Sequence, residues 1–89
     1  MTLPTIHMNG TSLRNLQEAN EKASDAIREA IEALAQTAPN GRDYYPQSNE
    51  AIHDAMEEHW ARMNRLQLVR LELEHIGEYL ADEELRRRR

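Results

Sequence analysis

Two long stretches of this chain have the spacing of an amphipathic helix, and a single break separates them. Apolar residues recur every three or four positions from Leu13 to Leu34 and again from Ile52 to Leu80, which is the spacing of one helical face. Residues 39–49, with the sequence PNGRDYYPQSN, interrupt this pattern with two of the three prolines and one of the three glycines, which favour turns. The pattern predicts an all-α chain folded as an antiparallel two-helix hairpin.

The residues between and around these stretches set the expected boundaries. Pro4 disfavours helix at the residue before it, and the last residues of the chain are arginines, which suit the negative end of a helix dipole. We therefore expect an extended arm over residues 1–10, a helix over 12–37, a loop over 38–47, a helix over 48–82 and a frayed basic tail over 83–89.

The first helix has end signals and a slender apolar stripe. Thr11 or Ser12 can cap its start, and Asn40 with Gly41 tolerate the left-handed conformation of a C-terminal cap. Asn20, at the edge of the stripe, either fixes the register or the oligomer state of the helices or simply reaches water. The many alanines predict a close seam with the second helix. The stripe consists of Leu13, Leu16, Ala19, Ala23, Ala26, Ile27, Ala30, Ile31 and Leu34.

The second helix, capped by Ser48 or Asn49, is apolar on more than one side. Its core stripe consists of Ile52, Ala55, Met56, His59, Met63, Leu66, Val69, Leu73, Ile76 and Leu80. Further apolar residues point away from this stripe, and a hairpin offers each helix only one partner in its own chain. The excess predicts a homo-oligomeric helical bundle. The expected interface residues are Trp60, Leu68, Leu71 and Ile76.

The two helices differ in length. At 1.5 Å per residue, the first spans roughly 36 Å and the second roughly 50 Å. If both start at the loop, the C-terminal turns of the second helix extend beyond the first. We expect the N-terminal arm, from the same chain or exchanged with a neighbouring subunit, to cover Leu73, Ile76, Tyr79 and Leu80 there.

Charge and composition exclude several classes of protein. The net charge is −5 at pH 7, which disfavours general DNA or RNA binding because phosphate backbones are bound by basic surfaces. No apolar run is long enough to span a membrane, and the N-terminus lacks the features of a signal peptide. The chain has no cysteine, so disulfides are excluded. We expect a protein of the cytoplasm.

Catalytic and metal-binding patterns are also absent from the sequence. Glu50 and His53, like Glu72 and His75, have the Glu-x-x-His spacing of di-iron bundles, but the two pairs lie too far apart on one helix to share a site. We expect His59 to pack in the core or at a subunit contact. No hydroxyl side chain has the histidine and orienting group that a nucleophile needs. We therefore expect no enzymatic activity, no metal and no cofactor.

Two segments carry residues that suit a small anionic ligand. The loop contains Arg42, Tyr44, Tyr45 and Gln47, in which arginine can hold a phosphate, a tyrosine can stack on a base and glutamine can bind its edge. Alternatively, the tyrosines fold back over the hairpin at its loop end and Arg42 pairs with Asp43 or Glu50. The second segment contains Asn9, Thr11 and Ser12 before a helix N-terminus, or is only a turn and a cap. Both segments could meet only across an antiparallel subunit contact.

The segments HMNGTS, residues 7–12, and NGRDYYPQ, residues 40–47, resemble a family of small helical proteins from tailed-phage and prophage genomes. The architecture is also similar to that of phage proteins that sequester cyclic nucleotide immune signals between subunits. These resemblances imply a non-enzymatic phage accessory protein that acts against host defence by binding a nucleotide between subunits. The alternative is a protein-interaction module, either an inhibitor of a host protein or a minor virion or assembly component.

Overall fold

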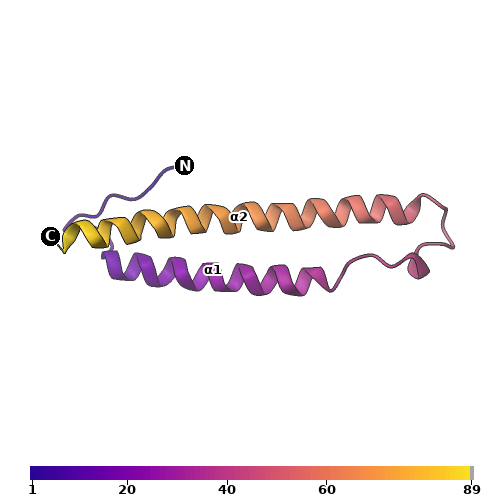
Figure 1. Ribbon diagram of the computed structural model, residues 1–89, viewed down its shortest axis with the longest axis horizontal. Coiled ribbons are helices and arrows are strands. Elements are labelled where there is room, and N and C mark those ends of the chain that lie inside the picture. Colours follow the sequence, from indigo (N-terminus) through magenta and orange to yellow (C-terminus); the bar gives the residue numbers. More distant parts are fainter. Residues whose placement is uncertain (89) are drawn as a thin grey trace.

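A computed structural model, which describes residues 1–88, shows two helices packed against each other. Helix α1 covers Leu13–Ala35, the short 3₁₀ helix η1 covers Gly41–Asp43, and helix α2 covers Ala51–Arg87. The helices run antiparallel in a rod of 64 × 21 × 20 Å, with the N-terminal arm beside the C-terminal part of α2 (Figure 1). The prediction of an all-α hairpin is confirmed for a single chain.

Helix α1 begins at the predicted cap and ends earlier than predicted. The hydroxyl of Ser12 accepts a hydrogen bond of 3.1 Å from the Asn15 N–H. The helix ends at Ala35, and two tighter turns follow, in which the N–H groups of Thr37 and Ala38 bond three residues back. Pro39 then ends the ladder, because it has no N–H and disfavours helix at the residue before it. The predicted left-handed cap at Asn40 and Gly41 is wrong, since no residue among 1–88 has a positive φ.

The seam between the helices does not follow the alanines. Half-buried residues of α1 recur every three or four positions, and three of them are polar: Leu13, Leu16, Gln17, Asn20, Ser24, Ile27, Ile31 and Leu34. The alanines at 19, 23, 26 and 30 are exposed, so their predicted place in the seam is wrong. The larger side chains of Leu13, Ile27, Ile31 and Leu34 bury more apolar area than alanine does. When they face α2, the polar residues on the same face of α1 also lie against α2.

Asn20 takes part in this seam rather than reaching water. Its side-chain amide donates a hydrogen bond of 3.0 Å to the Leu73 carbonyl of α2. Gly77 lies directly beside it, since a Cβ placed there would be 3.1 Å from Asn20 Nδ2. One turn earlier in α1, Gln17 Nε2 donates to a carboxylate oxygen of Glu84 at 3.0 Å. These contacts fix the level at which α1 lies on α2.

Helix α2 starts and ends later than predicted. It starts at Ala51 and its N-cap is Glu50 rather than the predicted Ser48 or Asn49, although the Ser48 hydroxyl accepts a hydrogen bond of 3.1 Å from the Ala51 N–H. It continues to Arg87, so the separate tail predicted over residues 83–89 is wrong for the described residues, and Arg89 lies outside them. Arg86 pairs with Glu83 at 2.9 Å and Arg88 with Glu84 at 2.7 Å. These i,i+3 and i,i+4 pairs, next to the negative helix end, support the last turn.

The unmatched part of α2 lies at the loop, not at the C-terminus as predicted. Because Asn20 is level with Leu73 and Gly77, the end of α1 at Ala35 is level with about residue 60 of α2. The first turns of α2 therefore extend past α1. The segment of residues 36–50, called the tip below, runs beside these turns before it joins α2 (Figure 1). Ala55 and His59, in these turns, are buried.

The arm covers the other end of α2 within its own chain. The Tyr79 hydroxyl donates a hydrogen bond of 2.7 Å to the Pro4 carbonyl, and Arg87 donates one of 3.1 Å to the Ile6 carbonyl. Of the four residues that the arm was predicted to cover, Tyr79 bonds it, whereas Leu73 and Leu80 line a groove between the two helices. Leu80 is 1% exposed there.

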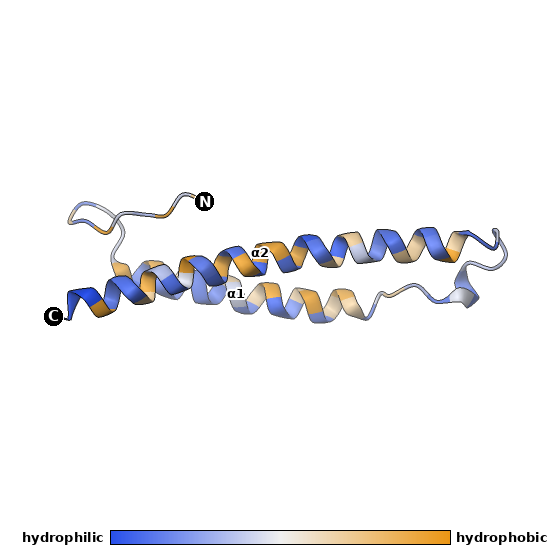
Figure 2. Cartoon of the chain, turned by 45° about the horizontal axis from the view of Figure 1, so that its top comes forward, coloured by the Kyte–Doolittle hydropathy of each residue, from blue (hydrophilic) through white to orange (hydrophobic). Residues whose placement is uncertain are grey.

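The core of the single chain is small. Only Ala55, His59 and Leu80 are buried among the described residues. Hydrophobic and hydrophilic segments alternate along both helices (Figure 2). Neither helix has a stretch that is both long and apolar enough to cross a membrane within residues 1–88.

Candidate functional site

The tip presents its arginine and one tyrosine to solvent. The side chain of Asn40 accepts a hydrogen bond of 2.9 Å from the Arg42 N–H and so starts η1. Tyr44 is half-buried, whereas Tyr45 is 77% exposed. Arg42 and Gln47 are exposed too, and within residues 1–88 the Arg42 side chain has no ion pair with Asp43 or Glu50. One tyrosine thus folds inward, while Arg42 and Tyr45 are available to a ligand.

The segment before α1 forms a turn and a cap. The Gly10 N–H donates to the His7 carbonyl at 3.1 Å, and the His7 ring lies against Gly10, where a Cβ would be 2.8 Å from Nε2. Ser12 is the helix cap, so its hydroxyl already accepts a bond. Asn9 and Thr11 are exposed. Of the three predicted ligand residues here, two have side chains without a structural role.

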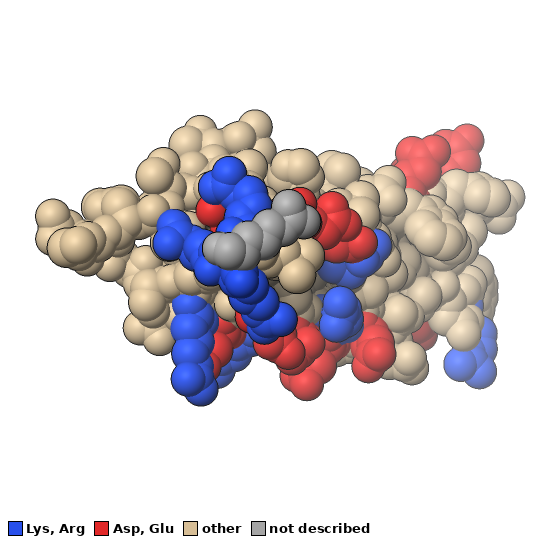
Figure 3. Space-filling model, turned by 60° about the vertical axis from the view of Figure 1, so that its left-hand side comes forward, with Lys and Arg blue, Asp and Glu red and all other residues tan. Residues whose placement is uncertain are grey.

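Arginines gather at the same end of the rod, which we call the open end. Figure 3 shows them around the C-terminus with acidic side chains beside them. Glu84 accepts bonds from Gln17 at 3.0 Å and from Arg88 at 2.7 Å. The Gln17 hydrogen bond, followed by the charge of Arg88, lowers the pKa of Glu84 below its usual 4.5. The Glu84 carboxylate is therefore held ionised and balances part of the arginine charge.

Within one chain the two predicted ligand segments do not meet. The tip lies at one end of a 64 Å rod and Asn9, Thr11 and Ser12 lie at the other, at the start of α1 (Figure 1). A pocket built from both segments requires a second chain placed antiparallel to the first.

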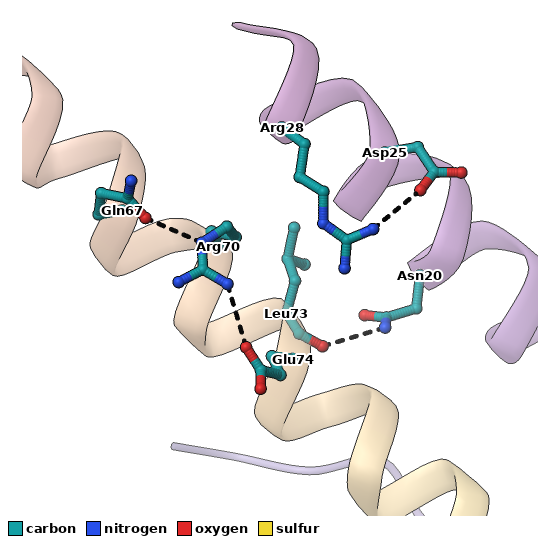
Figure 4. Close-up of polar contacts among 7 residues, drawn as sticks. All are labelled: Asn20, Asp25, Arg28, Gln67, Arg70, Leu73 and Glu74. Carbon is teal, nitrogen blue, oxygen red and sulfur yellow. Dashed lines mark hydrogen bonds and ion pairs between the residues drawn. The ribbon is translucent and has the colours of Figure 1, made fainter. Parts of the chain in front are cut away.

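The hairpin also has a groove that was not predicted from the sequence. It has a volume of about 360 Å³ and lies on one side of the helix pair, where Arg28 lines it from α1 and Arg70 from α2 (Figure 4). Arg28 is 3.4 Å from Asp25, and Arg70 is 3.1 Å from Glu74. Both arginines already have a carboxylate partner, so the groove does not favour an anion. The sequence signal for it is the polar residues at heptad spacing in the seam: Gln17, Asn20, Ser24 and Arg70.

The predicted interface residues on α2 fall into two groups. Trp60, Leu68 and Leu71 are 57%, 62% and 50% exposed and lie within about 80° of one another around the helix. We call these three the Trp60 face. Ile76 is half-buried and points about 140° away from Leu71, so it belongs to a different side of α2.

His59 is a buried histidine with one unpaired nitrogen. It is 4% exposed, packs edge-on to Trp60 at 6.2 Å between ring centres, and its Nδ1 has no hydrogen-bond partner. Among residues 1–88 no three histidine, aspartate or glutamate side chains gather as metal ligands. The prediction that His59 packs in the core agrees with this burial.

Comparison with protein-family models, curated proteins and solved structures finds no match.

Proposed function

We propose that this chain is a non-enzymatic phage accessory protein that binds a small anionic ligand, a nucleotide immune signal, at its tip and sequesters it between subunits. The observation that carries the proposal is the pair of Arg42 and Tyr45, both exposed and neither held by a partner within its own described chain. A tip that only connected two helices would need fewer residues, since helix connections usually take 2–8. The resemblance of residues 7–12 and 40–47 to phage proteins supports the same class.

The roles follow from the chemistry of the side chains. The Arg42 guanidinium offers a planar fork of donors to two phosphate oxygens, and the Tyr45 ring offers a flat face to a base. Gln47 and, from another subunit, Asn9 and Thr11 supply neutral hydrogen bonds. Such a site binds and releases its ligand unchanged, because it has no general base and no activated nucleophile.

Isothermal titration calorimetry against cyclic and linear nucleotides tests this function. We expect one ligand class to bind, Arg42→Ala to weaken it by about 10-fold or more through loss of a charged hydrogen bond, and Tyr45→Phe to retain it while Tyr45→Ala does not. Arg28→Ala, at an exposed arginine of α1 on the groove side of the rod, is the matched control and should bind as the wild type does. A folded protein that binds nothing in the panel would refute the proposal.

A second function is favoured by the Trp60 face. An exposed tryptophan flanked by two exposed leucines is the residue pattern of a protein-binding surface, because aromatic anchors dominate binding energies. We propose as the alternative that this face binds a host protein or a virion component. Its test is a pull-down in which one protein is retained at fixed stoichiometry, is lost with Leu68→Glu and is kept with Leu85→Glu, an equally exposed leucine. If the Leu68→Glu variant still retains that protein, the Trp60 face is not the binding surface.

A further inference from the structure

The alanines that the seam leaves uncovered form a continuous stripe. Ala19, Ala23, Ala26, Ala30 and Ala33 are all exposed and fall within about 80° around α1. They lie on the side opposite the polar groove: Ala23, for example, is two residues, or about 200°, from the groove residues Glu21 and Asp25.

Helix α2 continues this apolar surface. Ile76 follows the groove residue Glu74 by two positions, and Val69 precedes Ile76 by one heptad, so both lie across the inward-facing Leu73 from Glu74. Because the helices are antiparallel and packed, these residues flank the alanines on the same side of the rod. We call this surface the alanine face. It consists of Ala19, Ala23, Ala26, Ala30 and Ala33 of α1 with Val69 and Ile76 of α2.

The solvent-exposed area of this chain is larger than that of a compact protein of the same mass. A compact monomer of 10.4 kDa exposes about 5,400 Å² by the usual scaling with mass. This chain exposes 7101 Å². The excess of about 1,700 Å² per chain is what an obligate homodimer buries, since such interfaces total about 2,000–5,000 Å² over both partners.

We infer that a second copy of this chain packs antiparallel on the alanine face and completes a four-helix bundle. A two-fold axis pairs each residue of the face with a residue of the partner, and the two residues of each pair must be compatible in size and charge. With the axis between Ala26 and Ile27 on α1, Ala23 faces the partner's Ala30. Small residues at these contacts let the two α1 helices approach closely.

The same symmetry pairs the residues of α2. Val69 faces the partner's Ile76, and Arg62 faces the partner's Glu83. Both pairs have their midpoint between Glu72 and Leu73 of α2, which lies within about 5 Å of the α1 midpoint along the rod. A parallel dimer would instead place Arg62 on the partner's Arg62 and Glu83 on the partner's Glu83. In their own chain, Arg62 is 4.0 Å from Glu58 and Glu83 is 2.9 Å from Arg86, so the cross-chain pairs extend existing charge networks.

This arrangement also assembles the ligand site. In an antiparallel dimer the tip of one chain lies beside the open end of its partner. Arg42 and Tyr45 then face the partner's Asn9 and the partner's Thr11, at the arginine-rich end shown in Figure 3. Only this part of the inference rests on the proposed nucleotide function; the dimer itself does not.

Sedimentation and light scattering test the interface. We expect a wild-type mass of twice 10.4 kDa and a dissociation constant raised about 100-fold or more by Ala26→Glu, because it sets two carboxylates against each other at the axis. Ala61→Glu, at an exposed alanine beside the Trp60 face, is the matched control and should remain dimeric. A monomeric wild type, or a dimer broken by Ala61→Glu and not by Ala26→Glu, overturns the inference.

Crosslinking tests the orientation without depending on the stability of a monomer. The chain has no cysteine, so single cysteines report only their own contacts. A mixture of Ala19→Cys and Ala33→Cys chains should give mixed crosslinked dimers with a short bifunctional maleimide, and each variant alone should give few. The reverse result indicates a parallel dimer and overturns the inference. A dimer of the expected kind that binds no nucleotide refutes the proposed function alone, whereas Arg42-dependent binding by a monomer refutes the dimer alone.

Discussion

The contact between Asn20 and Gly77 predicts a coupled effect of two substitutions on stability. Replacing glycine by alanine inside a helix stabilises it by about 0.8–1.0 kcal/mol. At Gly77 the new methyl group would lie 3.1 Å from Asn20 Nδ2, closer than an ordinary contact. Asn20 must then move away from the Leu73 carbonyl that it bonds at 3.0 Å, at a cost of about 0.5–1.5 kcal/mol. Gain and cost nearly cancel.

A double-mutant cycle separates the two terms. We expect Gly77→Ala to change the free energy of unfolding little in the wild type and to raise it by about 1 kcal/mol in an Asn20→Ala background. The coupling energy of about 1 kcal/mol is measurable by urea titration, followed by far-ultraviolet circular dichroism at one fixed protein concentration, since dimerisation makes stability depend on concentration.

The control for this cycle is Asn64→Ala, at an exposed position of α2. It alters helix propensity without contacting Asn20, so its effect should be the same in both backgrounds. If Gly77→Ala is equally stabilising with and without Asn20, then Asn20 does not set the level of α1 on α2 and the register described above is wrong.

Three further predictions follow from other contacts. Leu80→Ala should destabilise the fold by about 2–5 kcal/mol in urea titration, because Leu80 is 1% exposed, whereas Leu68→Ala at a 62% exposed position should cost far less; equal losses would contradict the assigned core. Tyr79→Phe should cost about 1 kcal/mol and speed chymotryptic cleavage in the arm, since it removes the bond to Pro4; an unchanged cleavage rate would show that this bond does not hold the arm. The lowered pKa of Glu84 contributes stability that is complete above its unfolded value, near 4.5, and is lost as the pH falls through the folded pKa. Melting temperatures between about pH 6 and pH 3 should therefore fall less steeply in Glu84→Gln than in the wild type, and parallel curves would exclude this contribution.

The sequence determined the hairpin itself. Two helical periods separated by a segment rich in proline and glycine allow few other folds. Local chemistry limited the first cap to Thr11 or Ser12, because capping involves only neighbouring residues, and the structure has it at Ser12. The exposed Trp60, Leu68 and Leu71 were predicted for a similar reason: they point away from the main stripe of α2 whatever the partner helix does.

Only the tertiary structure decided which side of α1 meets α2 and at what level. The apolar residues of α1 cover an arc wider than one partner helix can bury, so periodicity alone could not choose between its leucines and isoleucines and its alanines. Packing selects the larger side chains, brings Asn20 into the seam beside Gly77 and leaves the alanines exposed. The same choice moves the unmatched turns of α2 to the tip and keeps Arg42 and Thr11 of one chain at opposite ends of the rod.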